Sequence, residues 1–255
     1  MTRMTRASLI GALVAVGLVA IGGVALAQNF EGTPADDTIT GTERPDGIWG
    51  EAGADTLTGL DGNDYIEGGP DADTVDAGRG ADLAIGGSGN DKIQLGDGDD
   101  VAYAGPGDDE VLGEKGDDVL LGQPGADRLF GGPDSDRLYT GGGRDYADGG
   151  AGPDQIFAGW GTGELVGGRG NDSIEAQSGI WTAWGGPGRD TIELGPGPDH
   201  AIGGSGHDTI KTGGGNDDID VNDGQTDTVD CGDGIDTVEA GKQDTLKNCE
   251  IVTRN

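Results

Sequence analysis

A non-polar residue recurs every nine positions from Ile39 to Ile219, without a miss in 21 consecutive units. Each of these residues forms a three-residue group with its two neighbours. The six residues between successive groups are rich in glycine, aspartate, asparagine and proline. Each three-residue group predicts a very short strand with its central residue pointing inward. The six-residue stretches predict turns that use positive φ angles. The pattern therefore predicts an all-β repeat array without helices.

Successive nine-residue units must turn back on one another if every non-polar residue is to reach a common interior. Two units then complete one coil of 18 residues, and unit n stacks on unit n+2. The 21 units would form about ten coils spaced ~4.8 Å apart.

An aspartate lies two residues before the inward position in 19 of the 21 units, usually with glycine two residues before it. These candidate metal ligands are Asp37, Asp46, Asp55, Asp64, Asp73, Asp82, Asp91, Asp100, Asp109, Asp118, Asp127, Asp136, Asp145, Asp154, Asp172, Asp190, Asp199, Asp208 and Asp217.

Units such as Gly86 to Gln94 (GGSGNDKIQ) and Gly203 to Lys211 (GGSGHDTIK) resemble the RTX, or haemolysin-type, calcium-binding nonapeptide G-G-x-G-x-D-x-U-x. The resemblance covers roughly three quarters of the chain. It implies a parallel β-roll, a right-handed β-solenoid, in which Ca²⁺ ions lie between stacked loops.

The charge of the chain agrees with a polyvalent cation partner. Without residues 1–27, which contain Arg3 and Arg6, 48 acidic side chains face 13 basic ones, a net charge of −35. Stacked aspartates ~5 Å apart repel, and Ca²⁺ accepts six or more carboxylate and carbonyl oxygens. We number the units from the one that contains Asp37, so that odd-numbered units stack along one edge and even-numbered units along the other. Stacked pairs with aspartate in both units number nine on the even edge and seven on the odd edge. About sixteen Ca²⁺ ions would nearly cancel the charge.

The alternative to a folded array is a disordered acidic linker. Such a linker gives no reason for a non-polar residue at the same position of every unit.

Residues 1–27 have the features of a secretory signal peptide: Arg3 and Arg6, an apolar run from Leu9, and the ending Ala25-Leu26-Ala27. The alternative is an uncleaved membrane anchor; if the segment is removed, no stable membrane span remains. We expect a secreted, extracellular protein. Relatives in the RTX family typically leave through an exporter that recognises the C-terminus, so this segment departs from the family pattern.

The repeat register slips after Asp217, moving the aspartate to Asp227 and Asp236 and then to Asp244. The only cysteines, Cys231 and Cys249, lie in this region. In an exported chain the pair predicts one disulfide, with unpaired thiols or a metal pair as the alternative. We expect a signal peptide over 1–27, a calcium-binding β-roll over 28–222 and a disulfide-tied C-terminal cap over 223–255.

Two units lack the aspartate and stack on each other on the odd edge: Gly163 and Trp181 replace it in units 15 and 17. Three calcium pairs should be lost there. Trp160, Trp181 and Trp184 lie in the same two units. They either pack into the gap or form a ligand platform for a glycan or a cell-surface component.

No catalytic constellation is visible in the sequence. His200 and His207, the only histidines, both occupy repeat positions, and no serine-hydrolase or zinc-protease motif occurs. We expect no catalytic residues, no enzyme activity and no nucleic-acid partner. The sequence favours a secreted calcium-binding structural or interaction module, and the alternative function is a carbohydrate- or surface-binding adhesin.

Overall fold

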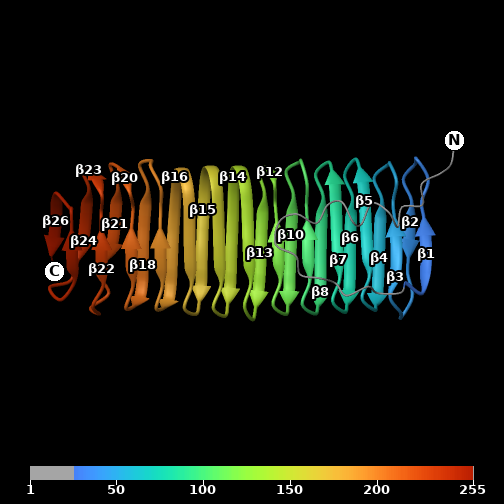
Figure 1. The fold of residues 1–255 in the computed structure, drawn as a ribbon, viewed down its shortest axis with the longest axis horizontal. Coiled ribbons are helices and arrows are strands. Elements are labelled where there is room, and N and C mark those ends of the chain that lie inside the picture. Colours follow the sequence, from blue (N-terminus) through green and yellow to red (C-terminus); the bar gives the residue numbers. More distant parts are fainter. Residues whose placement is uncertain (1–25, 255) are drawn as a thin grey trace.

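The computed structural model describes residues 26–254, which form one long parallel β-solenoid. Figure 1 shows the coils stacked along a rod, with the first strand at one end and the last at the other. The signal segment predicted for 1–27 lies almost entirely outside the described residues. Within the described part of the chain, no helix is long and apolar enough to cross a membrane.

The strands follow the repeat along the whole described chain. Their bounds are β1 Gln28–Glu31, β2 Thr38–Thr40, β3 Asp46–Trp49, β4 Thr56–Asp61, β5 Tyr65–Pro70, β6 Thr74–Arg79, β7 Leu83–Ser88, β8 Lys92–Asp97, β9 Val101–Tyr103, β10 Glu110–Lys115, β11 Val119–Leu121, β12 Pro124–Gly125, β13 Arg128–Pro133, β14 Arg137–Ala151, β15 Gln155–Arg169, β16 Ser173–Gly188, β17 Thr191–Glu193, β18 His200–Gly206, β19 Thr209–Lys211, β20 Gly214–Gly215, β21 Asp218–Val221, β22 Thr228–Asp230, β23 Asp233–Gly234, β24 Thr237–Ala240, β25 Thr245–Lys247 and β26 Ile251–Arg254.

Strands pair in parallel with partners 18 residues away, so the prediction that unit n stacks on unit n+2 is confirmed. Thr56 of β4, for example, is opposite Thr74 of β6, which is in turn opposite Lys92 of β8. The solenoid has about 13 coils, because β1 and the strands after Asp217 extend the array of 21 units at both ends.

Many strands are longer than the three residues predicted from the sequence. β4 and β6, for example, continue for three further positions, to Asp61 and Arg79. The reason is that equivalent residues of stacked coils share one backbone conformation, so their N–H and C=O groups still face each other beyond the strand triplet. Glycine is required where the stacked backbones approach most closely: Gly80 has φ +150°, and a Cβ there would lie 1.4 Å from the carbonyl oxygen of Gly62.

The predicted inward residues form the core. From Ile48 to Ile219 every one of them is at most 1 % exposed, while Ile39 near the end of the rod is partly buried. A second inward column, five residues before each aspartate, adds residues such as Ala77, Leu95 and Ala104 where glycine is absent. The interior is one narrow seam of aliphatic side chains, so each coil contributes little apolar burial of its own.

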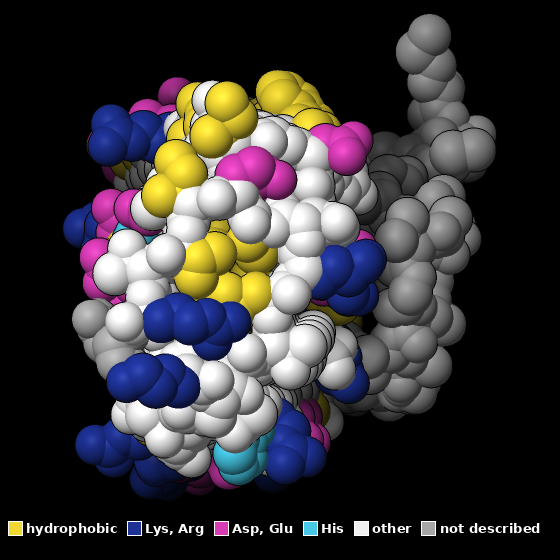
Figure 2. Space-filling model, turned by 90° about the vertical axis from the view of Figure 1, so that its left-hand side faces the viewer, with side chains coloured by type: hydrophobic (Ala, Val, Ile, Leu, Met, Phe, Trp, Pro, Cys, Tyr) yellow, Lys and Arg dark blue, Asp and Glu magenta, His cyan; other side chains and the backbone are white. Residues whose placement is uncertain are grey.

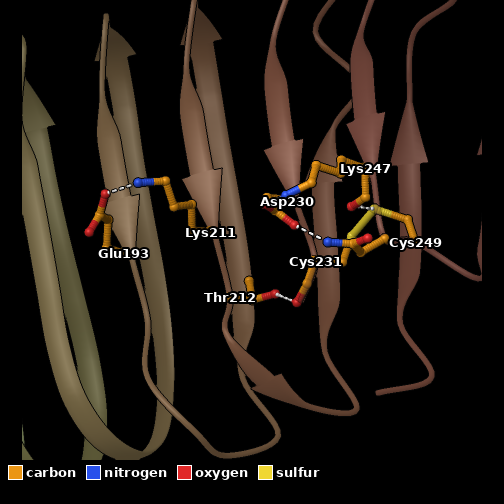
Figure 3. A network of polar contacts seen from close by, with 8 residues as sticks. Glu193, Lys211, Thr212, Asp230, Cys231, Lys247 and Cys249 are labelled. Atoms are coloured by element: carbon orange, nitrogen blue, oxygen red, sulfur yellow. Dashed lines mark hydrogen bonds and ion pairs between the residues drawn. A yellow bond between two sulfur atoms is a disulfide. The ribbon is translucent and has the colours of Figure 1, made fainter. Parts of the chain in front are cut away.

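The C-terminal region continues the coils with altered spacing. Asp218 of β21 pairs with Thr237 of β24, and Thr228 of β22 pairs with Thr245 of β25. The predicted disulfide is present: Cys231 and Cys249 are joined with their Cα atoms 5.3 Å apart. Figure 3 shows this bond beside the ion pair of Lys247 with Asp230, at 2.6 Å.

The last strand, β26, leaves an open edge that pairs with β24 alone among the described strands. Seen from this end, the rod shows hydrophobic side chains in its middle with lysine and arginine side chains around them (Figure 2). Ile251 and Val252 of β26 are 51 % and 39 % exposed. Basic side chains at an edge strand discourage pairing with another chain.

Candidate metal sites in two aspartate columns

The aspartates predicted as metal ligands lie in two columns, one along each edge of the rod, where a loop leads into the next strand. Except for half-buried Asp37, each is at most 3 % exposed. The side chains therefore point towards the interior, although the segment around them is polar. Stacking brings together the aspartates of units n and n+2, as the sequence predicts.

One carboxylate oxygen of each aspartate is held by the neighbouring coil. Along both columns the backbone N–H of one aspartate donates to Oδ1 of the aspartate 18 residues later, at 2.7–3.1 Å. Asp100, for example, donates to Asp118, which donates to Asp136. This ladder fixes the orientation of the carboxylates that accept from it.

The second oxygen, Oδ2, has no hydrogen-bond partner in nineteen buried aspartates of the described chain. A buried carboxylate oxygen without a partner is costly, because desolvation is not compensated. The nineteen are Asp55, Asp64, Asp73, Asp82, Asp91, Asp100, Asp109, Asp118, Asp127, Asp136, Asp145, Asp154, Asp172, Asp190, Asp199, Asp208, Asp217, Asp227 and Asp236.

The ends of the columns differ from the interior. In the first two units a threonine supplies the missing donors: Thr42 donates its backbone N–H and its Oγ1–H to Asp46 Oδ2, both at 2.7 Å. Thr33 does the same for Asp37. At the other end, Asp244 Oδ2 accepts the N–H of Gly241 at 2.7 Å. The protein thus satisfies its carboxylates at the start of both columns and at the end of the even column. The interior carboxylates and Asp236, at the end of the odd column, remain unsatisfied.

Where the residue five positions before the aspartate is glycine, a backbone carbonyl oxygen accompanies the unsatisfied Oδ2, except at Gly203 beside Asp208. A Cβ on Gly50 would lie 2.3 Å from Asp55 Oδ2 and 2.6 Å from the carbonyl oxygen of Gly68 in the next coil. The same arrangement recurs at Gly113, beside Asp118 and Gly131. Glycine therefore leaves space in which carboxylate and carbonyl oxygens from adjacent coils converge.

This donor set fits a hard cation that accepts backbone oxygens. Within residues 26–254, no three histidine, cysteine, aspartate or glutamate side chains converge in one metal centre. A zinc-like site made of side chains alone is thus not formed in this region. Ca²⁺ takes both carboxylate and carbonyl oxygens, in sets of six to eight, and the columns present both.

The electrostatics of the columns point the same way. Burial raises the pKa of Asp118 to about 8, and the charges of Asp100 and Asp136 add to the shift. The pKa of Asp82 rises to about 7 for the same reasons, and that of Asp91 to about 6. These carboxylates are costly to ionise near neutral pH unless a cation neutralises them.

The columns extend beyond the predicted ligands. Asp208 donates its N–H to Asp227 Oδ1 and Asp227 to Asp244 Oδ1, at 2.8 and 3.1 Å. On the other edge Asp217 donates to Asp236, at 2.9 Å. The pairs are 17 or 19 residues apart, which a search at strict nine-residue spacing misses. The sequence still contained a signal for these additional ligands. After the register slip, each aspartate is again followed two residues later by an inward residue such as Val229.

The odd column breaks where the sequence predicts. Gly163 offers no carboxylate to Asp145, and the ladder resumes where the Trp181 N–H donates to Asp199 Oδ1 at 2.8 Å. The three tryptophans do not form one patch. Trp181 is buried in the core, Trp184 is half-buried on the outer face of β16, and Trp160 is 68 % exposed.

Around this break the loops of units 13, 15 and 17 become continuous strands. Residues 137–188 form β14, β15 and β16, which pair through the loop positions, with Asp145 opposite Gly163 and Gly163 opposite Trp181. Gly163 has φ +151°, and a Cβ there would lie 1.9 Å from the carbonyl oxygen of Asp145. The backbone here differs from the rest of the column and leaves no space for an aspartate side chain at position 163. We call the loop positions of β14, β15 and β16 the rebuilt edge.

We therefore expect that restoring the sequence pattern will not restore the site. The double variant Gly163→Asp with Trp181→Asp should bind no more Ca²⁺ than the parent. It should also lose at least ~3 kcal/mol of stability, from the core tryptophan and the strained backbone. Equilibrium dialysis and denaturant unfolding in calcium check both expectations. Two or three additional ions in a variant that remains folded would contradict this interpretation of the edge.

The geometry defines a parallel β-solenoid with stacked acidic loops. A comparison with known families matches the RTX calcium-binding nonapeptide repeat at residues 31–66, 49–84, 85–120, 121–156, 157–179, 184–219 and 194–227. These matches cover most of the chain, which belongs to this family and is a calcium-binding repeat protein. A search of curated proteins finds no match.

Proposed function

We propose that this protein is a secreted, extracellular structural or interaction module whose rod folds on Ca²⁺ and is held by it. The aspartates from Asp55 to Asp217 that lack a partner for Oδ2 would be the ligands, together with carbonyl oxygens of the stacked loops. These aspartates form 14 stacked pairs, and the pairs of Asp208 with Asp227 and of Asp217 with Asp236 bring the number of sites to about sixteen. The ions supply charge neutralisation and cross-links between coils.

One observation carries the proposal: unsatisfied carboxylate oxygens run through the interior of both columns, whereas hydrogen bonds satisfy them at three of the four column ends. A fold that was stable without cations would have no reason for this contrast. Export is supported by the predicted signal segment and by the disulfide. Extracellular calcium suits modules whose sites have modest affinity.

A charge-neutral substitution tests the proposal because its two effects have opposite signs. Asp118→Asn keeps the Oδ1 acceptor of the ladder but removes a charged ligand shared by the sites towards Asp100 and Asp136. Bound calcium should fall by one or two ions. Stability in saturating calcium should drop by up to ~2.7 kcal/mol for each ion lost at a hundredfold excess over Kd. In metal-free buffer the same variant should be more stable than the parent, because a buried charge has been removed.

The matched control is Asp37→Asn at the end of the array, where Thr33 already satisfies Oδ2. It should change the calcium count by at most one ion. Denaturant titrations give the stability in calcium, the pH midpoint of folding in chelator compares the two metal-free chains, and equilibrium dialysis gives the ion count. Equal effects of the two variants, or a stabilisation by Asp118→Asn that persists in calcium, would refute the proposal.

A further inference from the structure

The rebuilt odd edge presents a surface unlike any other part of the described rod. Because β14, β15 and β16 pair through the loop positions, nine outward residues form three cross-strand rows. The buried Trp181 supports this surface from below, and its Nε1–H donates to the carbonyl oxygen of Ser178 at 3.3 Å. The rows of this edge patch are Gly142, Trp160 and Ser178; Arg144, Thr162 and Ile180; and Tyr146, Glu164 and Thr182.

Trp160 offers a free ring face. It is 68 % exposed, more than any other large hydrophobic side chain in the described chain. A Cβ on Gly142 would lie 2.8–3.1 Å from three indole atoms, so one face of the ring rests on that glycine. With this exposed fraction, the opposite face of the ring is accessible to a ligand. By contrast, Tyr139 and Phe157 on the even-numbered side stack on each other, with ring centroids 4.9 Å apart and planes at 13°, which covers the facing ring surfaces.

A groove of about 580 Å³ lies over the next two rows of the patch, lined by Arg128, Arg144, Thr162 and Glu164 and by the column aspartates Asp127 and Asp145. Trp160 does not line it but lies two residues before Thr162 on β15. Arg128 is held in place over the ring of Tyr146, with its guanidinium carbon 4.9 Å from the centroid. Arg144 is exposed and takes part in none of the ion pairs found among residues 26–254. Two basic side chains thus line the groove together with three carboxylates. Asp127 and Asp145 are buried in the odd column, which leaves Glu164 as the exposed acid of the groove.

The size of this site favours a small ligand over a protein partner. Grooves of ~300–1,000 Å³ are typical of small-molecule sites, whereas a stable protein interface buries ~800 Å² on each side around an apolar centre. Here Trp160 and Ile180 are the only strongly exposed apolar side chains of the patch. Its remaining members are mostly polar side chains that donate or accept hydrogen bonds.

We propose that the edge patch binds an acidic sugar, such as a short uronic-acid oligosaccharide. One pyranose ring would stack on the free face of Trp160. The guanidinium of Arg144 would pair with the sugar carboxylate, which it can hold with two hydrogen bonds. Thr162 and Glu164 would hydrogen-bond hydroxyl groups of the sugar. Glu164 lies four residues after Trp160 on the same strand, so it would contact a neighbouring ring and not the ring on the indole. This activity goes beyond the proposed structural role and needs only the folded rod.

The test uses a galacturonate trisaccharide and its methyl ester, which has the same rings without the charge. Isothermal titration calorimetry on calcium-loaded protein should give a Kd below ~1 mM for the acid and at least about tenfold weaker binding of the ester. Trp160→Ala should weaken binding of both ligands about tenfold. Arg144→Gln should remove the preference for the acid. If bound calcium rather than Arg144 recognised the carboxylate, that preference would persist in the variant, which would overturn the assignment.

Matched controls come from the even-numbered side of the rod. Tyr139→Ala removes an aromatic side chain that is 37 % exposed, and Arg137→Gln removes an exposed guanidinium. Neither should change the affinity for the acid. Circular dichroism in calcium confirms that each variant is folded. The proposal is overturned if the folded parent shows no binding at millimolar sugar, or if both patch variants bind like the parent.

Discussion

Chelating calcium from residues 28–255 near pH 7.5 should convert the rod into an expanded chain. The radius of gyration should rise from about 20 Å for a rod of stacked coils to about 50 Å for an unfolded chain of this length. Two unit charges ~5 Å apart repel by about 3 kcal/mol at an effective dielectric constant of 20. Repeated along both columns, this repulsion exceeds the ~5–15 kcal/mol by which domains are normally stable. Replacing calcium should restore the rod cooperatively, because each coil contacts only its neighbours.

Small-angle scattering and far-UV circular dichroism, with and without millimolar Ca²⁺, check this expectation. Magnesium at the same concentration is the control, because it prefers a compact octahedral shell and dehydrates reluctantly. Sodium chloride at equal ionic strength controls for screening. We expect neither salt to restore the β-structure. An equally compact chelated chain would contradict the account.

Acid should partly replace calcium. In the folded, metal-free rod, burial raises the pKa of Asp118 to about 8, of Asp136 to about 7 and of Asp100 to about 6, all from 3.8. The folded state therefore binds more protons than the unfolded state between these values. The corresponding stability is fully present below about pH 3.8 and is lost as the pH rises through about 6 to 8. The metal-free chain should accordingly regain compactness and β-structure when the pH is lowered from about 7.5 to about 5.

In calcium the pH dependence has the opposite sign, because protons compete with the metal for the same carboxylates. The calcium concentration at the folding midpoint should rise as the pH falls from about 7.5 to about 5. Circular dichroism in resin-treated, calcium-free buffer and in calcium titrations measures both trends. A metal-free chain that stays expanded at every pH above 4 would show that charge on the columns is not what prevents folding.

The periodicity was sufficient to predict the fold. A non-polar residue every nine positions predicts the inward column, the 18-residue coil and the n/n+2 pairing, and the structure confirms all three. Strand length was predicted less well. β4 continues past the strand triplet because stacked backbones keep their hydrogen bonds wherever their conformations match, whatever the side chains are.

The columns of aspartates were predicted, but their chemistry depends on contacts that the sequence pattern does not contain. That Asp118 has one bonded and one unsatisfied oxygen follows from the offset between stacked loops. The threonine that completes Asp46 is likewise visible only in three dimensions. The tryptophans show the same limit. Trp181 takes the sixth position of its nonapeptide, that of the aspartate, which points inward. Trp160 takes the third position, which points outward. Trp181 is therefore buried and Trp160 exposed, although both belong to the rebuilt edge.

The central claim is that Ca²⁺ occupies the space beside the unsatisfied Oδ2 atoms. It is tested most directly by anomalous diffraction from crystals of residues 28–255 grown in calcium. The account predicts anomalous peaks at ~2.3–2.6 Å from Oδ2 along both columns, with a gap in the odd column between Asp145 and Asp199. Crystals of the folded rod without peaks beside these oxygens, or with an unbroken row of peaks past Gly163 and Trp181, would contradict it.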